Sequence, residues 1–206
     1  MRYDAINNFI EEITNYGGFV PATMNGNLPD PAKLSRASDM ELYALALYLY
    51  SLSPPPNPNQ PSSLTRRGAL VFHREGCGSC HTPPLYTNNM LTPVAGFRIP
   101  AGDRQKYRIL DIVVGTDSAL ATKTRRGTGY YKVPSLKGVW YRGPFEHNGS
   151  VATLEDWFDP TRLRDDYIPT GYRGYGNASR AIRGHEFGLK LDHEDKRALI
   201  AFLKTL

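Results

Sequence analysis

The chain has 206 residues and a mass of 23.0 kDa, which is enough for one sizeable domain or for one domain with an appended segment. Its 25 lysines and arginines exceed its 20 acidic residues and give a formal charge of +5, but the basic residues are scattered among the acids. Because no nucleic-acid-binding motif accompanies this charge, we expect no nucleic-acid partner. No stretch approaches the ~20 apolar residues of a membrane span.

The first fifty residues predict two helices. Apolar residues recur at helical spacing over residues 1–16 and stop at Gly17. A second helix begins after Ser38, a capping residue with Glu41 three positions later, and continues to Tyr50. Because this second helix is apolar nearly all round, we expect it to be buried. Two short helices are too small to fold alone, so we expect them to pack on another domain.

A proline-rich stretch over residues 54–63 predicts a stiff, extended linker. It divides the chain into a helical segment over 1–53, the linker, and a main domain over 64–206. The whole chain has 19 glycines, 16 prolines and a hydrophobic fraction of 40%, which indicates a loop-rich protein.

The strongest chemical signal is the C-x-x-C-H run at residues 77–81, directly after a helix predicted over 64–75. Two thiols three residues apart reach the two vinyl groups on one edge of a porphyrin, and the adjacent imidazole then lies under the iron. A thioredoxin-like pair or half a zinc site also uses C-x-x-C, but no βαβ pattern and no second cysteine pair is present. We therefore expect one covalent haem c on Cys77 and Cys80, with His81 as the proximal ligand.

The helix over 64–75 is expected to turn four apolar side chains toward the haem: Leu64, Ala69, Leu70 and Phe72. Residues 82–84 cannot continue a helix, and a backbone carbonyl there is expected to accept the Nδ1 proton of His81. Residues 86–128 look irregular. The densest basic run, residues 123–129, is either a solvated loop or, through Arg126, an anchor for haem propionates or an acidic redox partner.

The last third of the chain predicts short elements. An aromatic, β-branched stretch over 130–140 indicates an extended segment, and a turn at 143–150 precedes a short helix that reaches Phe158. A final helix begins near Asp192 and carries its apolar residues on one side. The predicted fold is mainly α, a cytochrome c-like haem domain with long irregular loops and a short β segment.

Together with C-x-x-C-H, the V-P-S-L run at 133–136 and the string P-F-E-H-N-G-S-V-A-T-L at 144–154 resemble the C-terminal haem domain of the bacterial di-haem cytochrome c peroxidase superfamily, in its rubber oxygenase-like branch. The resemblance covers roughly residues 64–206 and implies a class I-like cytochrome c fold. Family enzymes carry an N-terminal haem where peroxide or oxygen reacts and a C-terminal haem that relays electrons. This chain has a single C-x-x-C-H, so peroxidase activity is not carried over to it, and residues 1–53 resemble the remnant of a preceding haem domain.

Several side chains are candidates for the iron position opposite His81. His185 lies in R-G-H-E-F-G, whose glycines let the backbone approach a ligand closely. This stretch resembles the G-H-x-F-G element whose histidine completes a bis-His haem in the rubber oxygenase branch. Met90, which would raise the reduction potential, and an open position are alternatives. His147, in the family string, is expected at the haem edge, with ligation as a further alternative. His73 lies too close to His81 in the sequence, a capping or solvent role is expected for His193, and Met24 and Met40 are expected to be loop and core residues.

We expect a c-type cytochrome domain that transfers single electrons, with His81 and His185 as its metal ligands. The alternatives are a di-haem peroxidase- or oxygenase-type enzyme, or part of one, and a gas or redox sensor. Trp140 and Trp157 are either core residues or parts of an electron path, and the expected partner is a redox protein or an upstream haem domain. Because haem c is attached after export, we expect a periplasmic or otherwise exported protein, although residues 1–4 begin no signal peptide.

Overall fold

The computed structural model describes three stretches of the chain: residues 39–123, 128–173 and 182–206. The chain divides into two compact units, Met1–Pro56 and Asn57–Leu206. The helix predicted over 1–16 and the cap predicted at Ser38 lie outside the described residues. The described elements are mostly helices joined by long loops, together with a short two-stranded sheet. The prediction of a mainly α, cytochrome c-like fold with a short β segment is confirmed.

The described part of the first unit contains the helix α2 (Asp39–Ser51). Ala46 is buried, whereas most of its large apolar side chains are exposed: Met40, Tyr43, Leu47, Tyr48, Leu49 and Tyr50. The prediction that this helix is buried is therefore wrong for the chain by itself. An apolar helix is buried only where other elements cover each side, and the rest of the described first unit, residues 52–56, has no helix or strand.

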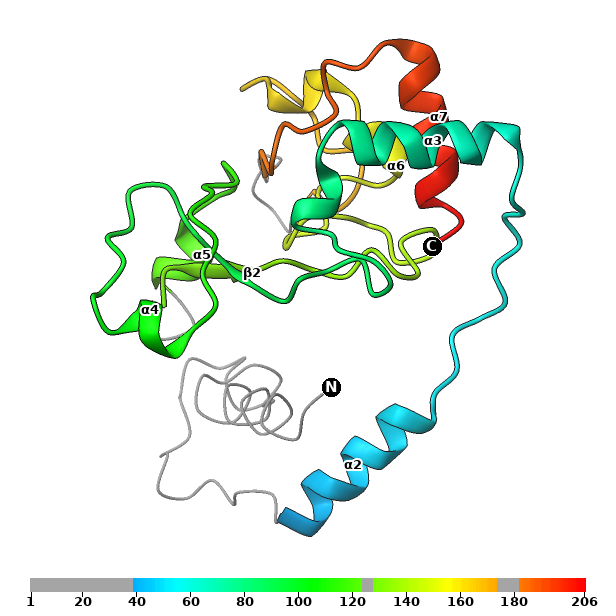
Figure 1. The fold of residues 1–206 in the computed structure, drawn as a ribbon. Coiled ribbons are helices and arrows are strands. Elements are labelled where there is room, and N and C mark those ends of the chain that lie inside the picture. The colour runs from blue at the N-terminus through cyan, green and yellow to red at the C-terminus, as the bar shows by residue number, and fades with distance from the viewer. Residues whose placement is uncertain (1–38, 124–127, 174–181) are drawn as a thin grey trace. The chain divides into compact units, whose positions relative to one another are not determined.

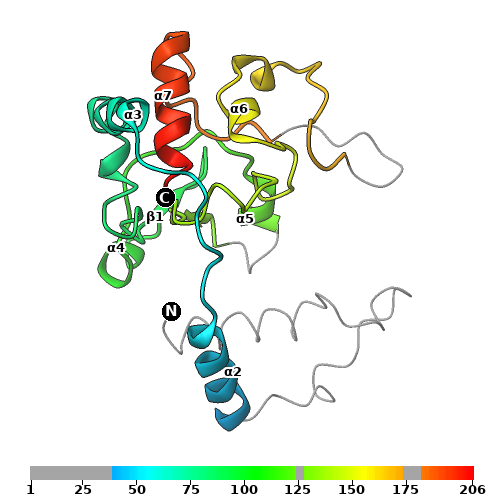
Figure 2. The same ribbon diagram turned by 90° about the vertical axis from the view of Figure 1, so that its right-hand side faces the viewer.

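The second unit is built around α3 (Ser63–Arg74) and α7 (His193–Leu203), which pack against each other (Figures 1 and 2). Ser62 and Thr65 form a capping box at the start of α3, and the Asp192 side chain caps α7. The core cluster gathers residues from these helices and from the loops that join them: Val71, Phe72, Val139, Leu154, Phe158, Leu199 and Leu203.

The buried residues of α3 lie on one face, at spacings of three or four from Gly68: Thr65, Gly68, Val71 and Phe72. The predicted apolar face is right for Phe72, while Leu64 and Ala69 are half-buried. It is wrong for Leu70, which is 72% exposed. Leu70 lies two residues from Gly68 and two from Phe72, and a separation of two residues turns the helix by about 200°, away from the buried face.

Gly68 lies where α3 crosses α7, and a Cβ there would collide with the Ala198 carbonyl and with Phe202. Backbone cannot move aside easily, so we expect Gly68→Ala to lower the free energy of unfolding by about 1–3 kcal/mol, despite the gain of up to about 1 kcal/mol in helix propensity. Urea unfolding of the haem-loaded chain measures the change. Gly102→Ala is the control, because a Cβ there meets nothing within 4 Å. Equal stability of the Gly68→Ala chain and the wild type would contradict this packing.

Asp195 links α7 to α3 through two arginines. Its side chain is only 9% exposed and accepts hydrogen bonds from Arg74 Nη2 and from Arg67 Nε, both at 2.8 Å. Hydrogen bonds from Arg74 and then from Arg67 lower the pKa of Asp195 below its ordinary value. A carboxyl with a lowered folded-state pKa stabilises the fold above its unfolded-state pKa, and this stabilisation is lost as the pH falls through the folded-state pKa.

We therefore expect Asp195→Asn to lower the melting temperature near neutral pH, and the difference from wild type to shrink below about pH 4. Thermal melts followed by circular dichroism across this range measure both effects. Asp166→Asn is the matched control, because it removes an exposed pair with Arg164 and should change little. A gap between Asp195→Asn and wild type that stays constant into acid would overturn this assignment of the ion pair.

Between the two helices the described residues form seven short elements: η3 (Cys77–Ser79), β1 (Leu91–Pro93), α4 (Asp103–Lys106), α5 (Ala119–Lys123), β2 (Tyr130–Lys132), α6 (Leu154–Trp157) and η5 (Pro160–Leu163). β1 and β2 pair antiparallel, with Leu91 opposite Lys132. Figure 1 shows α3, α6 and α7 on one side of the unit and α4, α5 and β2 on the other. The prediction that 86–128 is irregular missed β1, α4 and α5, which are too short for periodicity to reveal. None of the described helices is long and apolar enough to cross a membrane.

Candidate functional site

The C-x-x-C-H run forms a tight turn directly after α3. Gly76 adopts a left-handed conformation (φ 72°), and η3 follows it. The His81 N–H donates to the Cys77 carbonyl at 2.8 Å, so the two cysteines and the histidine are gathered within one turn of backbone. Cys77 and Cys80 are half-buried free thiols, and burial raises the pKa of Cys77 to about 11. The turn therefore presents two uncombined sulfur atoms beside one imidazole.

Two backbone carbonyls orient His81. Its Nδ1 lies 3.2 Å from the Tyr86 oxygen and 3.1 Å from the Pro134 oxygen. Because a carbonyl oxygen only accepts, Nδ1 carries the proton and Nε2 keeps a free lone pair. Burial lowers the pKa of His81, which favours the neutral ring that a metal requires. The carbonyls of Tyr86 and Pro134 therefore accept the Nδ1 proton of His81. The prediction that a carbonyl of residues 82–84 accepts this proton is wrong.

Pro134 reaches His81 because the V-P-S-L run packs along the loop that follows the haem motif. The Thr87 hydroxyl donates to the Val133 carbonyl at 2.7 Å, and the Leu136 N–H donates to the Tyr86 carbonyl at 3.2 Å. The Ser135 hydroxyl donates to the backbone of the same loop at 2.5 Å. These bonds explain why a run some fifty residues downstream belongs to the same site.

His185 is partly buried in an aromatic pocket. Its ring centroid lies 5.3 Å from that of Trp157, in an edge-on arrangement, and 5.3 Å from that of Phe187. Its Nδ1 is buried and has no hydrogen-bond partner among the described residues. Burial, followed by the charges of His81 and Arg162, lowers the pKa of His185 to about 4. His185 is therefore neutral near pH 7 and lies within electrostatic reach of His81.

These donors fit a haem better than a free metal ion. Within the described residues, no group of three or more His, Cys, Asp or Glu side chains is arranged to hold a metal. Two neutral imidazoles alone leave most of a metal's coordination positions unfilled, whereas a porphyrin supplies four nitrogens and leaves two axial positions. The two thiols on the His81 turn suit thioether attachment. Buried polar atoms usually have a hydrogen-bond partner, but His185 Nδ1 has none among the described residues. This ring is therefore not held by a hydrogen bond to another described residue.

His147 makes contacts of its own. It stacks on Tyr131, with ring centroids 5.5 Å apart and planes 14° from parallel, and its Nε2 lies 3.4 Å from Asp117 Oδ2. This imidazole is therefore engaged at one nitrogen and on one face. Its predicted place at the haem edge stays a prediction.

The other candidates are dispersed. His73 and Met40 are exposed, and the His193 side chain is 83% exposed at the first turn of α7. Met90 is half-buried, with its backbone held by Asn88 Oδ1. Two predicted residues, Met24 and Arg126, lie outside the described residues.

Sequence reasoning missed two charged residues of the site. Arg162 is fully buried and stacks its guanidinium on Trp157 at 4.7 Å. The Glu146 Oε1 is buried with no hydrogen-bond partner among the described residues, and burial raises the pKa of Glu146 to about 7 against the opposing effect of Arg162. Arg162 stands in the charged run D-P-T-R-L-R, a pattern typical of a solvated loop, so no signal in the sequence marked it.

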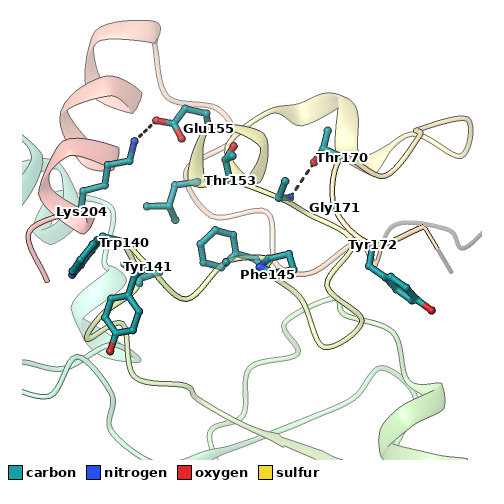
Figure 3. Close-up of a pocket in the computed structure, with 14 residues that line it drawn as sticks. Trp140, Tyr141, Phe145, Thr153, Glu155, Thr170, Gly171, Tyr172 and Lys204 are labelled. Carbon is teal, nitrogen blue, oxygen red and sulfur yellow. Dashed lines mark hydrogen bonds and ion pairs between the residues drawn. The ribbon is translucent and has the colours of Figure 1, made fainter. Parts of the chain in front are cut away.

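A separate hollow of about 670 Å³ lies beside α6 (Figure 3). It is lined by aromatic rings, including Trp140, Tyr141 and Phe145, and the Glu155–Lys204 ion pair lies along one edge. The haem-motif residues and His185 do not line it. Phe145 connects the two regions, because its ring also packs 6.5 Å from that of Trp157.

Comparisons with known proteins find cytochrome c-like relatives of this chain. A family model described as RoxA-like, cytochrome c-like matches residues 129–167. Cytochrome-c peroxidase IdrP1 of Pseudomonas sp. (strain SCT) is 26% identical over 161 residues, which cover 68% of this chain and 39% of the relative. Methylamine utilization protein MauG of Methylorubrum extorquens is 26% identical over 142 residues, which cover 68% of this chain and 34% of the relative. The chain is therefore similar to proteins of the di-haem cytochrome c peroxidase superfamily.

The predicted resemblance to this superfamily is confirmed. The chain spans about two fifths or less of the length of these relatives. A shorter match, 31% identical over 105 residues, links 37% of this chain to 18% of the uncharacterized protein y4iJ of Sinorhizobium fredii. Similarity to a cytochrome c-like family implies covalently bound haem c.

Proposed function

We propose that this chain is a c-type cytochrome domain that carries one haem and transfers single electrons. Cys77 and Cys80 would hold the haem covalently, and His81 and His185 would be the ligands of its iron. One observation carries the proposal: His185 is a neutral, partly buried imidazole that lies within electrostatic reach of His81 and has a buried ring nitrogen without a partner among the described residues. Two histidines at iron leave no open position for peroxide or oxygen.

Each residue has a defined task in this function. The two thiols provide the covalent attachment points, and the carbonyls of Tyr86 and Pro134 keep the His81 ring in the tautomer with Nε2 free. His185 excludes water and small ligands from the opposite side. When bound, the haem supplies an iron that takes up and releases one electron without exchanging ligands.

A peroxidase- or oxygenase-type function is the second candidate, since one relative is named a cytochrome-c peroxidase. Such activity would require an open iron position in this domain, or a second haem in a longer polypeptide of which this domain is a part. We propose that the partner is a redox protein or an upstream haem domain. An exported location, such as the periplasm, follows from the site of haem c maturation.

The optical spectrum of the haem-loaded chain, matured in an export-competent host, tests the proposal. Electron transfer predicts six-coordinate low-spin ferric and ferrous bands, reversible one-electron reduction, no change on addition of peroxide, and cyanide binding only at concentrations far above those that saturate an open haem. A high-spin ferric spectrum together with consumption of peroxide would favour the enzymatic alternative and overturn the proposal.

A further inference from the structure

Arg162 is the largest fully buried side chain of the described residues, at 1% exposure. It comes from η5, just after α6, and lies under the loop that carries His185. Burying a guanidinium is costly unless its N–H groups and its charge are satisfied. The contacts that satisfy Arg162 therefore show what its burial achieves.

Each of the three guanidinium nitrogens donates to a backbone carbonyl. Nε donates to the Trp157 carbonyl at 2.6 Å, Nη1 donates to the Arg183 carbonyl, and Nη2 donates to the His185 carbonyl at 2.5 Å. The first acceptor is the last residue of α6, and the other two flank Gly184. Arg162 thus ties the His185 loop to α6, with each of its three nitrogens donating to a backbone carbonyl.

The loop has little other regular support. Residues 182–186 form no helix or strand, and Gly184 adopts a left-handed conformation (φ 55°). Gly184 also lies against the Glu146 carboxyl, so closely that a Cβ would collide with Oε1. Burial lowers the pKa of Arg162, and Glu146 is the charged group that opposes this effect most strongly. The Arg162 guanidinium also stacks on Trp157, whose ring contacts His185. One cation therefore fixes both the backbone of His185 and the aromatic wall beside its ring.

We propose that Arg162 is the positioning residue that holds His185 in place opposite His81. This inference rests on the proposed function, because it concerns the ligand assigned there. A planar fork with donors in three directions suits three separate carbonyls, whereas a lysine offers one donor centre on a flexible stem. Removing these hydrogen bonds by substitution of Arg162 keeps His185 in the chain but raises the fraction of molecules in which His185 is not bound to the iron.

Cyanide binding to the ferric haem-loaded chain measures that fraction, because the apparent affinity of an external ligand scales with the population of the open state. We expect Arg162→Lys to keep the low-spin spectrum without cyanide, yet to bind cyanide about tenfold more tightly than wild type. Arg162→Gln, which also removes the buried charge, provides a second variant of the same contact and should show a gain at least as large.

Gly68→Ala controls for general loss of stability, since it loosens the α3–α7 crossing and touches no atom of the His185 loop. Its cyanide affinity should equal that of wild type. Unchanged cyanide affinity in both Arg162 variants, or an equal gain in Gly68→Ala, would overturn the inference. His185→Ala separates this failure from an error in the proposed ligand: if it leaves the wild-type low-spin spectrum unchanged, another side chain holds the iron and the His185 assignment is wrong, whereas a high-spin spectrum keeps that assignment and leaves Arg162 as the residue under test.

Discussion

The chain in which Cys77 and Cys80 are both replaced by alanine should contain no covalently bound haem. The two sulfur atoms stand on one turn with His81 and are free thiols, so no other pair of residues can form the two thioether bonds. Mass spectrometry of the denatured chain should show the haem mass on wild type and its absence from the double variant. Haem-dependent staining of a denaturing gel should agree.

Two further variants make this result specific. Ser79→Ala, between the two cysteines, should retain the full haem mass, because its hydroxyl donates chiefly to the Gly76 carbonyl at 2.7 Å and lies 3.9 Å from Cys80 Sγ, a long contact that thioether formation does not need. Cys77→Ala alone should attach less haem, held by one thioether. Haem that remains on the double variant after denaturation would show that attachment occurs elsewhere in the chain.

His185→Ala should convert the ferric haem from low-spin to high-spin. The substitution removes a neutral imidazole within electrostatic reach of His81, and alanine provides no atom that can bind iron. The optical spectrum and electron paramagnetic resonance measure the conversion, and cyanide should then bind with an affinity at least about a hundredfold higher than in wild type. The reduction potential should also change, since a ligand has been lost.

His147→Ala is the matched control for the distal assignment. His147 stacks on Tyr131 and faces Asp117, so its loss should leave the spin state and cyanide affinity as in wild type. A high-spin spectrum in His147→Ala together with a low-spin one in His185→Ala would exchange the roles of the two histidines. Peroxide consumption that appears only in His185→Ala would show that the closed iron position is what separates this domain from a peroxidase.

Local patterns in the sequence predicted much of this protein. The C-x-x-C-H run predicted a haem site by the spacing of its own side chains, and this run folds as a single turn because the Cys77 carbonyl accepts from the His81 N–H. The helices α3 and α7 were predicted from apolar residues at helical spacing. The superfamily resemblance rested on strings of adjacent residues, and the comparisons confirm it.

The same local signals failed where burial depends on distant partners. Leu70 was assigned to the buried face of α3 because it is apolar, but the position of α7 decides which face is covered, and Leu70 lies opposite to it. The α2 helix is apolar on every side, yet its three tyrosines, Leu47 and Leu49 are exposed, because burial requires a neighbour that the described first unit does not contain.

Only the tertiary structure decided how the site is supported. Pro134 lies 53 residues beyond His81, and Arg162 lies more than twenty residues before His185, so no spacing rule connects them. A backbone carbonyl has no side-chain identity to read in a sequence, and a buried arginine has the same letter as a solvated one. The sequence therefore determined which groups can meet a haem, whereas the packing of distant loops decided which carbonyls orient one histidine and which guanidinium holds the loop of the other.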